Sequence, residues 1–287
     1  MSAVPLSGCE LCADPGPAAP WCAEKGVVQC RSCGLVFYAP GTSTVPAAAY
    51  DASYFNGGEY LDYARDKTIL QANFADRLEY LRRLSPGGGR LLEIGCAYGF
   101  FLELALRHWT VRGLDISNDA VEYARGHLGL DVSRGDFLDL PDEPASLDLV
   151  CLWDTIEHLE RPVQVIKKAA KWLKPGGHLV LTTGDVGSWV ARVRKGRWRQ
   201  VHPPTHLFYF SPATLRRAFA DAGLEMIDAP HVGHRRDLMS MIHGLCLRGG
   251  PWARRLAERL PFRDSSLSVN LNLFDILMAT ARKPLSR

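Results

Sequence analysis

Two pairs of cysteines near the start of the chain have the residue type and spacing of metal ligands. They read Cys9-Glu10-Leu11-Cys12 and Cys30-Arg31-Ser32-Cys33, with 17 residues between them. A CxxC turn presents two thiolates to one ion, and two such turns complete the tetrahedral site that Zn²⁺ prefers. Metal binding would also supply folding free energy to a short segment with little apolar core. The spacing therefore predicts a structural zinc ribbon over residues 1–45, with the ligands Cys9, Cys12, Cys30 and Cys33.

A second group of residues is suited to binding a nucleoside. The segment Glu93-Ile94-Gly95-Cys96-Ala97-Tyr98-Gly99 has small residues at alternate positions, directly after a predicted strand. Such a turn lets a ligand approach the backbone at the carboxyl end of a sheet. Asp115 and Asp136 end the next two predicted strands, where a carboxylate can accept hydrogen bonds from a ribose or an adenine amine. A dinucleotide motif would need a glycine at Phe100, so the pattern favours an adenosine without phosphates.

Alternating strands and helices must position these residues. Strands are predicted at 91–94, 111–115, 147–153, 178–182, 224–228 and 271–281, with a further short strand ending at Asp136. Helices are predicted at 66–84, 100–107, 118–127, 163–173 and 212–222. Residues 231–268 are predicted to form a helical, arginine-bearing insertion. Repeated β–α units predict an α/β fold, with a doubly wound, mostly parallel sheet and helices on both faces.

Composition agrees with a globular protein. Apolar residues make up 47% and charged residues 23% of the 287 residues, and the net charge is 34 − 31 = +3. This charge does not by itself imply a nucleic-acid or membrane partner. No run approaches the roughly 18 apolar residues of a membrane span, and no secretory signal is visible, so we expect a cytoplasmic protein. The expected organisation is a ribbon at 1–45, an aromatic linker and helix at 46–89, and an α/β domain at 90–287.

Residues 91–185 resemble the cofactor half of the class I S-adenosylmethionine (SAM)-dependent methyltransferases. The matching segments are Leu92–Gly99, Leu147–Val150, Asp154–Leu159 and Leu173–Gly177. The resemblance implies a Rossmann-like domain with a seventh, antiparallel strand, which residues 270–283 resemble, and SAM as cofactor with S-adenosylhomocysteine as product. Ala97 stands where the family usually has glycine, and it would weaken cofactor binding if that position needs φ > 0.

The resemblance also assigns roles to residues around the glycine turn. The cofactor-binding set is Glu93, Gly95, Ala97, Tyr98, Gly99, Asp115, Ile116, Asp136, Phe137, Trp153 and Asp154. Glu93 would orient the turn and the ammonium of the methionine part, and Asp115 would hold the ribose, with Ile116 beside the adenine. The three small residues of the turn would allow close backbone approach.

Four residues of this set would lie at the adenine and the sulfonium. Asp136 and Phe137 would bind the adenine edge, and Trp153 and Asp154 would lie beneath the sulfonium. Core packing is the alternative for Phe137 and Trp153. For the two acids Asp115 and Asp136 the alternative is a solvated loop position.

Methyl transfer to a hydroxyl needs a proton acceptor, which is most often histidine. His206 lies after the strand at 178–182 and before a helix, on the expected acceptor side, and His158 follows the strand at 147–153. We predict His206 as the general base with His158 in support, and His202 and then Tyr209 are the alternative candidates for the base. A histidine that bonds the backbone, or one that caps a helix, is the structural alternative for each.

The ribbon, the tyrosine-rich link and the tract before Phe210-Ser211 together resemble sugar methyltransferases of secondary metabolism and polysaccharide pathways. In the sugar C-methyltransferases the tract reads H-E-H, whereas here it reads Pro204-Thr205-His206. Loss of the acidic neighbour favours O-methylation of a sugar or natural-product hydroxyl over C-methylation. N-methylation also stays open.

The acceptor and the partners have further alternatives. Arg192, Arg194, Lys195, Arg197 and Arg199, interleaved with Trp189 and Trp198, predict either a solvated helix face or a site for a nucleotide-linked or phosphorylated acceptor. RNA is the less favoured ligand. An RNA or protein methyltransferase that docks through its ribbon is the rival function, and a non-catalytic binding module is the third. The sequence leaves the oligomeric state open, and a dimer would be compatible with it.

Overall fold

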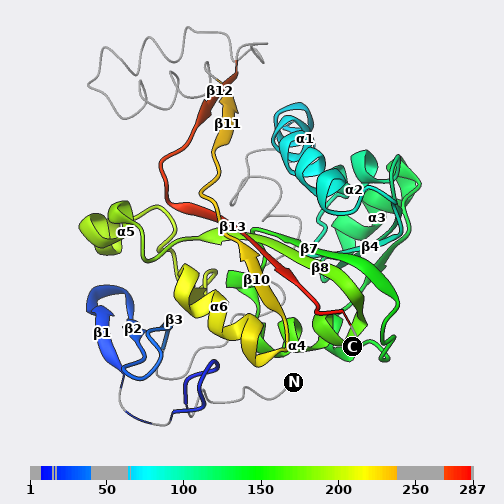
Figure 1. The fold of residues 1–287 in the computed structure, drawn as a ribbon. Helices are drawn as coiled ribbons and strands as arrows, with labels where there is room; N and C mark the ends of the chain where they lie inside the picture. Colours follow the sequence, from blue (N-terminus) through cyan, green and yellow to red (C-terminus); the bar gives the residue numbers. More distant parts are fainter. Residues whose placement is uncertain are drawn as a thin grey trace, which may run out of the picture.

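The fold is taken from a computed structural model, which describes residues 8–14, 16, 18–39, 64, 66–237 and 268–285. Most of the predicted aromatic linker lies outside these residues, and so does the part of the predicted insertion between residues 238 and 267. Within the described residues, two sheets and a two-stranded arm account for every strand (Figure 1).

The main sheet has seven strands in the order β10-β13-β8-β7-β4-β5-β6. The four central pairings, from β8 across to β6, are parallel, and β13 is antiparallel to both β8 and β10. The predicted sheet class and the antiparallel seventh strand are therefore confirmed. The strands are β4 (Arg90–Ile94), β5 (Thr110–Asp115), β6 (Val132–Arg134), β7 (Leu147–Trp153), β8 (Leu173–Gly184), β10 (Glu225–Asp228) and β13 (Ile276–Arg282).

Helices cover both faces of this sheet because its central strands are apolar on both sides. One apolar cluster joins the sheet to α1, α2 and α3, and another joins it to α4 and α6. Figure 1 shows these two groups on opposite sides of the strands. The helices are α1 (Lys67–Leu84), α2 (Phe100–Ala105), α3 (Asn118–Leu128), α4 (Pro162–Trp172) and α6 (Pro212–Asp221).

Capping residues explain where several helices begin. The Ser211 side chain accepts a hydrogen bond from the Thr214 backbone and Pro212 occupies the first turn, so α6 begins where the sequence predicts. The predicted end of α4 at residue 173 is one residue late. The helix ends at Trp172, and β8 begins at Leu173 rather than at His178. The pairing of β8 with β7 is irregular between Leu173 and His178, where the Pro-Gly-Gly segment lies.

The ribbon is joined to the α/β domain by backbone pairing. Its strands β1 (Ala19–Cys22), β2 (Val27–Gln29) and β3 (Val36–Tyr38) form an antiparallel sheet. The fourth strand of that sheet is β9 (Phe208–Tyr209), which lies about 170 residues later in the chain. The ribbon and the histidine-bearing segment before β9 are therefore parts of one structural unit.

The region around the predicted insertion differs from expectation. Residues His234–Asp237 form a strand, β11, instead of a helix, and they pair with β12 (Ser268–Leu271) in a separate antiparallel arm. The predicted strand at 271–281 is accordingly split between β12 and β13. The prediction failed because residues 234–237 obtain their backbone partners from a segment more than 30 positions away, which no local pattern reveals.

Candidate functional site

The glycine turn between β4 and α2 has the backbone conformation that its composition suggested. Gly95, Ala97 and Gly99 all have positive φ, at +73°, +45° and +79°. A Cβ at Gly95 would lie 2.5 Å from the Thr155 side chain, and one at Gly99 would lie 2.6 Å from Leu130. Glycine is therefore required at both positions, and Ala97 carries the strain of a left-handed conformation.

This strain gives a direct test of the turn. Ala97→Val is expected to destabilise the protein by about 2 kcal/mol, because a β-branched side chain adopts positive φ only at high cost. Ala97→Gly should stay within about 0.5 kcal/mol of the wild type, because relief of strain is offset by the greater entropy of glycine in the unfolded chain. Urea unfolding measures the free energy of unfolding of both variants. Equal stability of the valine and glycine variants would contradict the conformation assigned to this turn.

Asp115, at the end of β5, braces the turn. Its Oδ2 accepts a hydrogen bond from the Ala97 backbone N–H at 2.8 Å, and its Oδ1 accepts one from the Ser117 N–H at 2.9 Å. Burial raises the pKa of Asp115, and these backbone bonds partly offset the rise. Each oxygen keeps a second lone pair, so the carboxylate can still accept hydrogen bonds from a diol. The neighbouring Ile116 side chain is 43% exposed and offers a flat apolar surface.

Glu93, in β4 directly before the turn, is a buried acid without a full set of partners. It is 2% exposed, and its Oε2 has no hydrogen-bond partner. Burial and the nearby Asp115 raise its pKa well above the ordinary value, and Arg77 opposes the rise. An unpartnered carboxylate oxygen beside a ligand turn is suited to a cation. The role predicted for Glu93, pairing with the ammonium of the SAM methionine part, stays a prediction.

Arg77 is a site residue that sequence analysis missed. It lies on α1 with only 7% exposure, and its Nη2 is 3.3 Å from Asp154 Oδ2. The guanidinium also lies over the Trp153 ring, 5.0 Å from its centroid. The signal in the sequence is spacing, because Arg77 lies three residues after Phe74 and four before Leu81, on one face of the predicted helix. The structure buries all three. A cation on the apolar stripe of a helix points to a buried charged partner.

Asp154, after β7, is held in a strained position below the turn. Its φ is +50°, and its Oδ1 accepts a hydrogen bond from the Thr182 hydroxyl at 2.9 Å. Burial alone would raise the pKa of Asp154, but Arg77, then His234 and the Thr182 hydroxyl, lower it overall. The carboxylate is therefore charged near pH 7, and its predicted place beneath the sulfonium stays a prediction. Trp153 beside it is 6% exposed and packs edge-on against Phe101.

Two side chains of the predicted cofactor-binding set are buried in aromatic packing. Phe137 is 2% exposed and packs against Trp172, with ring centroids 4.9 Å apart, so its side chain belongs to the core. Tyr98 is 6% exposed and stacks on Tyr123. Asp136 is exposed, and its Oδ1 accepts a hydrogen bond from the Leu138 N–H, which caps the short helix Phe137–Asp139. Cofactor contacts from Asp136 and from the Phe137 backbone stay predictions.

The predicted base lies in a group of three histidines. The rings of His206 and His202 are 3.8 Å apart between centroids, and those of His206 and His158 are 4.6 Å apart. Burial, together with the other two histidines, lowers the pKa of His206 to about 2. Burial also lowers the pKa of His158 to about 4. Both rings are therefore neutral near pH 7, which is the state that a proton acceptor needs.

Glu157 lies against two of these histidines. Its side chain is buried with Oε2 unpartnered, and burial followed by the charge of Asp154 raises its pKa to about 8. Ligating atoms of Glu157, His158 and His206 lie within 4.8 Å of one another. This group can share a proton or hold a cation.

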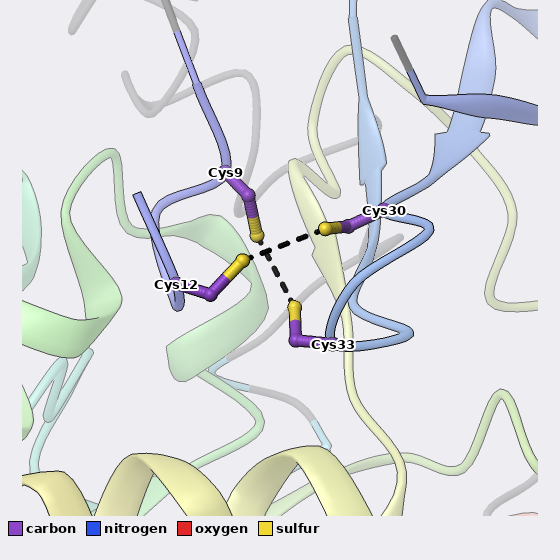
Figure 2. A group of neighbouring side chains, drawn as sticks. All are labelled: Cys9, Cys12, Cys30 and Cys33. Carbon is purple, nitrogen blue, oxygen red and sulfur yellow. Dashed lines mark hydrogen bonds between the residues drawn. The ribbon is translucent and has the colours of Figure 1, made fainter. Parts of the chain in front are cut away.

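The four predicted zinc ligands converge. Figure 2 shows Cys9 and Cys12 from one turn and Cys30 and Cys33 from the other, with their sulfur atoms pointing toward one another. The Sγ atoms of Cys9 and Cys33 are 3.3 Å apart and those of Cys12 and Cys30 are 3.6 Å apart. Zn–S bonds of about 2.3 Å in a tetrahedron require sulfur atoms roughly 3.8 Å apart, so the group fits Zn²⁺. All four are free thiols, and Cys22 lies outside the cluster.

The basic segment divides into two parts. Trp198 is 2% exposed, and its Nε1 donates a hydrogen bond to the buried Asp275, which also pairs with Arg199 at 2.8 Å. These residues are structural. By contrast, α5 (Trp189–Arg194) carries basic side chains at its surface, and Trp189 is 76% exposed. A ligand site on this segment therefore stays a prediction for α5 and for the exposed Lys195 and Arg197 that follow it.

A second acid–histidine pair was also missed. His231 Nε2 lies 2.9 Å from Asp185 Oδ2, and Asp185 directly follows β8 at the carboxyl end of the strand. The two residues are 46 positions apart, so no local pattern links them. A buried carboxylate that fixes a partly exposed imidazole is an arrangement that can handle protons.

A family model for a methyltransferase domain matches residues 64–229. The ubiquinone biosynthesis O-methyltransferase of Xanthomonas axonopodis pv. citri is 32% identical over 166 residues, which cover 53% of this chain and 70% of that protein. The protein of the same name from Idiomarina loihiensis is 30% identical over 169 residues, covering 53% of this chain and 68% of that protein. Both alignments leave nearly half of the chain unmatched.

Solved structures support the fold. A chain in the complex between the Haloferax volcanii Trm112 methyltransferase activator and a methyltransferase aligns with a TM-score of 0.57 at 23% identity, over 85% of this chain and 100% of that chain. A SAM-dependent methyltransferase from Archaeoglobus fulgidus aligns with a TM-score of 0.52 at 19% identity, over 77% of this chain and 99% of that chain. Among the residues that the structure describes, no helix has the length and apolar character needed to cross a bilayer.

Proposed function

Because the chain belongs to the class I SAM-dependent methyltransferases, with the domain model matching residues 64–229, we propose that it methylates a hydroxyl group of a small-molecule acceptor. The glycine turn carries this proposal, because an unpartnered buried carboxylate at Glu93 and a turn-bracing carboxylate at Asp115 flank it. The similarity to proteins named O-methyltransferases supports oxygen as the methylated atom.

The cofactor supplies an activated methyl group on a sulfonium. Glu93 would pair with its ammonium and Asp115 with its ribose diol, while the backbone of the turn would lie against the ligand. Arg77 would keep Asp154 charged and in place at the end of β7. These groups select a cationic nucleoside over a phosphorylated one, because acids rather than phosphate-binding amides surround the turn.

On the acceptor side, His206 is proposed to take the proton of the reacting hydroxyl, with His158 behind it. The position of His206 in one group with His158 and His202, at ring-centroid distances of 4.6 Å and 3.8 Å, supports this assignment. A sugar or natural-product hydroxyl is the proposed acceptor class, and a nucleotide-linked acceptor would find cations on α5. Thr205 in place of an acid argues against C-methylation. The four thiols are proposed to bind one structural Zn²⁺.

The test is methyl transfer itself. Purified protein with isotopically labelled SAM should transfer one labelled methyl group to a member of a panel of sugars, nucleotide sugars and quinone precursors. Mass spectrometry detects the added CH₂ and locates it on oxygen. Absence of saturable SAM binding by titration calorimetry would refute the function. Transfer only to nitrogen, to carbon or to a macromolecule would refute the acceptor class and leave the enzyme class intact.

A further inference from the structure

The loop that contains His206 is bonded to the ribbon on one side and to the α/β domain on the other. The Tyr38 N–H donates a hydrogen bond to the Leu207 carbonyl at 2.8 Å, and β3 continues this contact by pairing with β9. The Leu207 N–H donates to the Glu157 carbonyl, also at 2.8 Å. The residue that follows His206 is thus fixed from both directions.

The other neighbours of His206 are fixed as well. The His158 Nδ1–H donates to the Thr205 carbonyl at 2.8 Å, and the Tyr209 hydroxyl donates to the carbonyl of His206 itself at 3.1 Å. Tyr209 belongs to β9 and stacks against Trp21 of the ribbon, with centroids 6.5 Å apart. The ribbon is therefore connected to the loop that contains His206 by side-chain contacts as well as by backbone hydrogen bonds.

Apolar packing strengthens this connection. Val27 and Val36 of the ribbon are fully buried in one cluster with Trp198, Val201 and Tyr209. Five further ribbon residues belong to the apolar cluster that contains α4 and α6: Cys9, Leu11, Cys30, Leu35 and Phe37. The Lys25 ammonium donates a hydrogen bond to the Val201 carbonyl, one residue before the loop.

The ribbon has little means of staying folded without its cysteine cluster. Its strands have four, three and three residues, and their buried side chains pack mainly against the α/β domain. The Cys30 N–H donates to the Leu35 carbonyl, so the second cysteine turn leads directly into β3. Loss of the metal would therefore release β3 and with it the support of Leu207.

We infer that the ribbon is a component of the acceptor site, which holds the loop 202–209 and sets the position of His206. Figure 1 shows the ribbon beside α6, whereas α1, α2 and α3 pack on the opposite face of the main sheet. Disruption of the ribbon should therefore free His206 and leave SAM binding intact. The positioning claim stands on the contacts above, and only its meaning for catalysis rests on the proposed role of His206.

Chemical protection of histidines tests the inference without an activity assay. Diethyl pyrocarbonate modifies accessible neutral imidazoles, and peptide mass spectrometry measures the rate at each histidine. The doubly substituted variant Cys30→Ser with Cys33→Ser should lose bound zinc, and its His206 should react at least about tenfold faster than in the zinc-loaded wild type. SAM affinity, measured by calorimetry, should stay within about twofold, because the predicted SAM-binding turn follows β4, whereas the ribbon pairs with β9.

Three controls make the outcome decisive. Cys22→Ser removes a ribbon thiol outside the cluster and should keep zinc and His206 protection. His127 on α3 is exposed and serves as the reference for reagent activity, and His178 in β8 reports whether the α/β domain stays folded. The second variant, Trp21→Ala with Lys25→Met, keeps the cysteines and should raise His206 reactivity about threefold.

The overturning results are equally clear. Protection of His206 that survives in both the cysteine variant and the contact variant refutes the inference. If the cysteine variant also exposes His178, its α/β domain is no longer folded. The inference is then tested by His206 reactivity in the contact variant, Trp21→Ala with Lys25→Met, alone. Faster His206 modification together with unchanged turnover would uphold the positioning and refute the catalytic role proposed for His206.

Discussion

Asp115→Ala is expected to weaken SAM binding about 100-fold. The carboxylate would accept two hydrogen bonds from the ribose diol, and charge-assisted bonds of this kind contribute about 1.5 kcal/mol each, which together correspond to that factor. Alanine also removes the acceptor for the Ala97 and Ser117 N–H groups, so the turn loses its brace. Calorimetric titration of the purified variant with SAM measures the effect.

A set of matched variants separates the loss of the ribose hydrogen bonds from the loss of the hydrogen bonds that hold the turn. Asp115→Asn keeps one carbonyl acceptor, and it should lose less affinity than alanine. Asp119→Ala removes an exposed acid four positions later and should bind SAM like the wild type. Thermal unfolding without SAM measures the cost to the turn alone. An Asp115→Ala protein with wild-type affinity would show that the nucleoside binds away from β5.

The positions of most strands of the main sheet were readable from the sequence because that information is local. The central strand β7 is a short, nearly continuous apolar run, and Ser117 and Ser211 mark the starts of helices by capping. The errors arose where partners are distant. The arm of β11 and β12 pairs residues more than 30 positions apart, and β9 joins a ribbon that precedes it by about 170 positions. No pattern within a window of the sequence contains such pairings.

The site shows the same division. The glycine turn, Asp115 and the four cysteines were identified because each forms a compact motif or ends a strand. Burial was not accessible in this way, so the sequence left adenine binding and core packing open for Phe137, whose side chain the structure buries. Arg77 was overlooked because charge at a helix position is ordinarily read as solvent-facing. Its partner Asp154 lies 77 positions away.

His206→Ala is expected to lower kcat about 1000-fold while SAM affinity and the KM for the acceptor change little. A positioned general base contributes 10²- to 10⁴-fold, and its loss acts mainly on the transition state. Because the pKa of His206 is lowered to about 2, the ring is already neutral at mildly acidic pH. The ratio of wild-type to variant kcat should therefore stay constant between about pH 5 and pH 9.

The neighbouring histidine provides the control for this prediction. His202 lies in the same loop, with its ring centroid 3.8 Å from that of His206, and it binds the Thr205 hydroxyl through Nδ1 at 2.7 Å. His202→Ala should lower kcat less than tenfold if His206 carries the proton, because the loop keeps its backbone contacts to Glu157 and Tyr38. Equal losses in the two variants would mean that the histidines only hold the loop. Unchanged kcat in His206→Ala would move the search for the base to His231, whose imidazole Asp185 already orients.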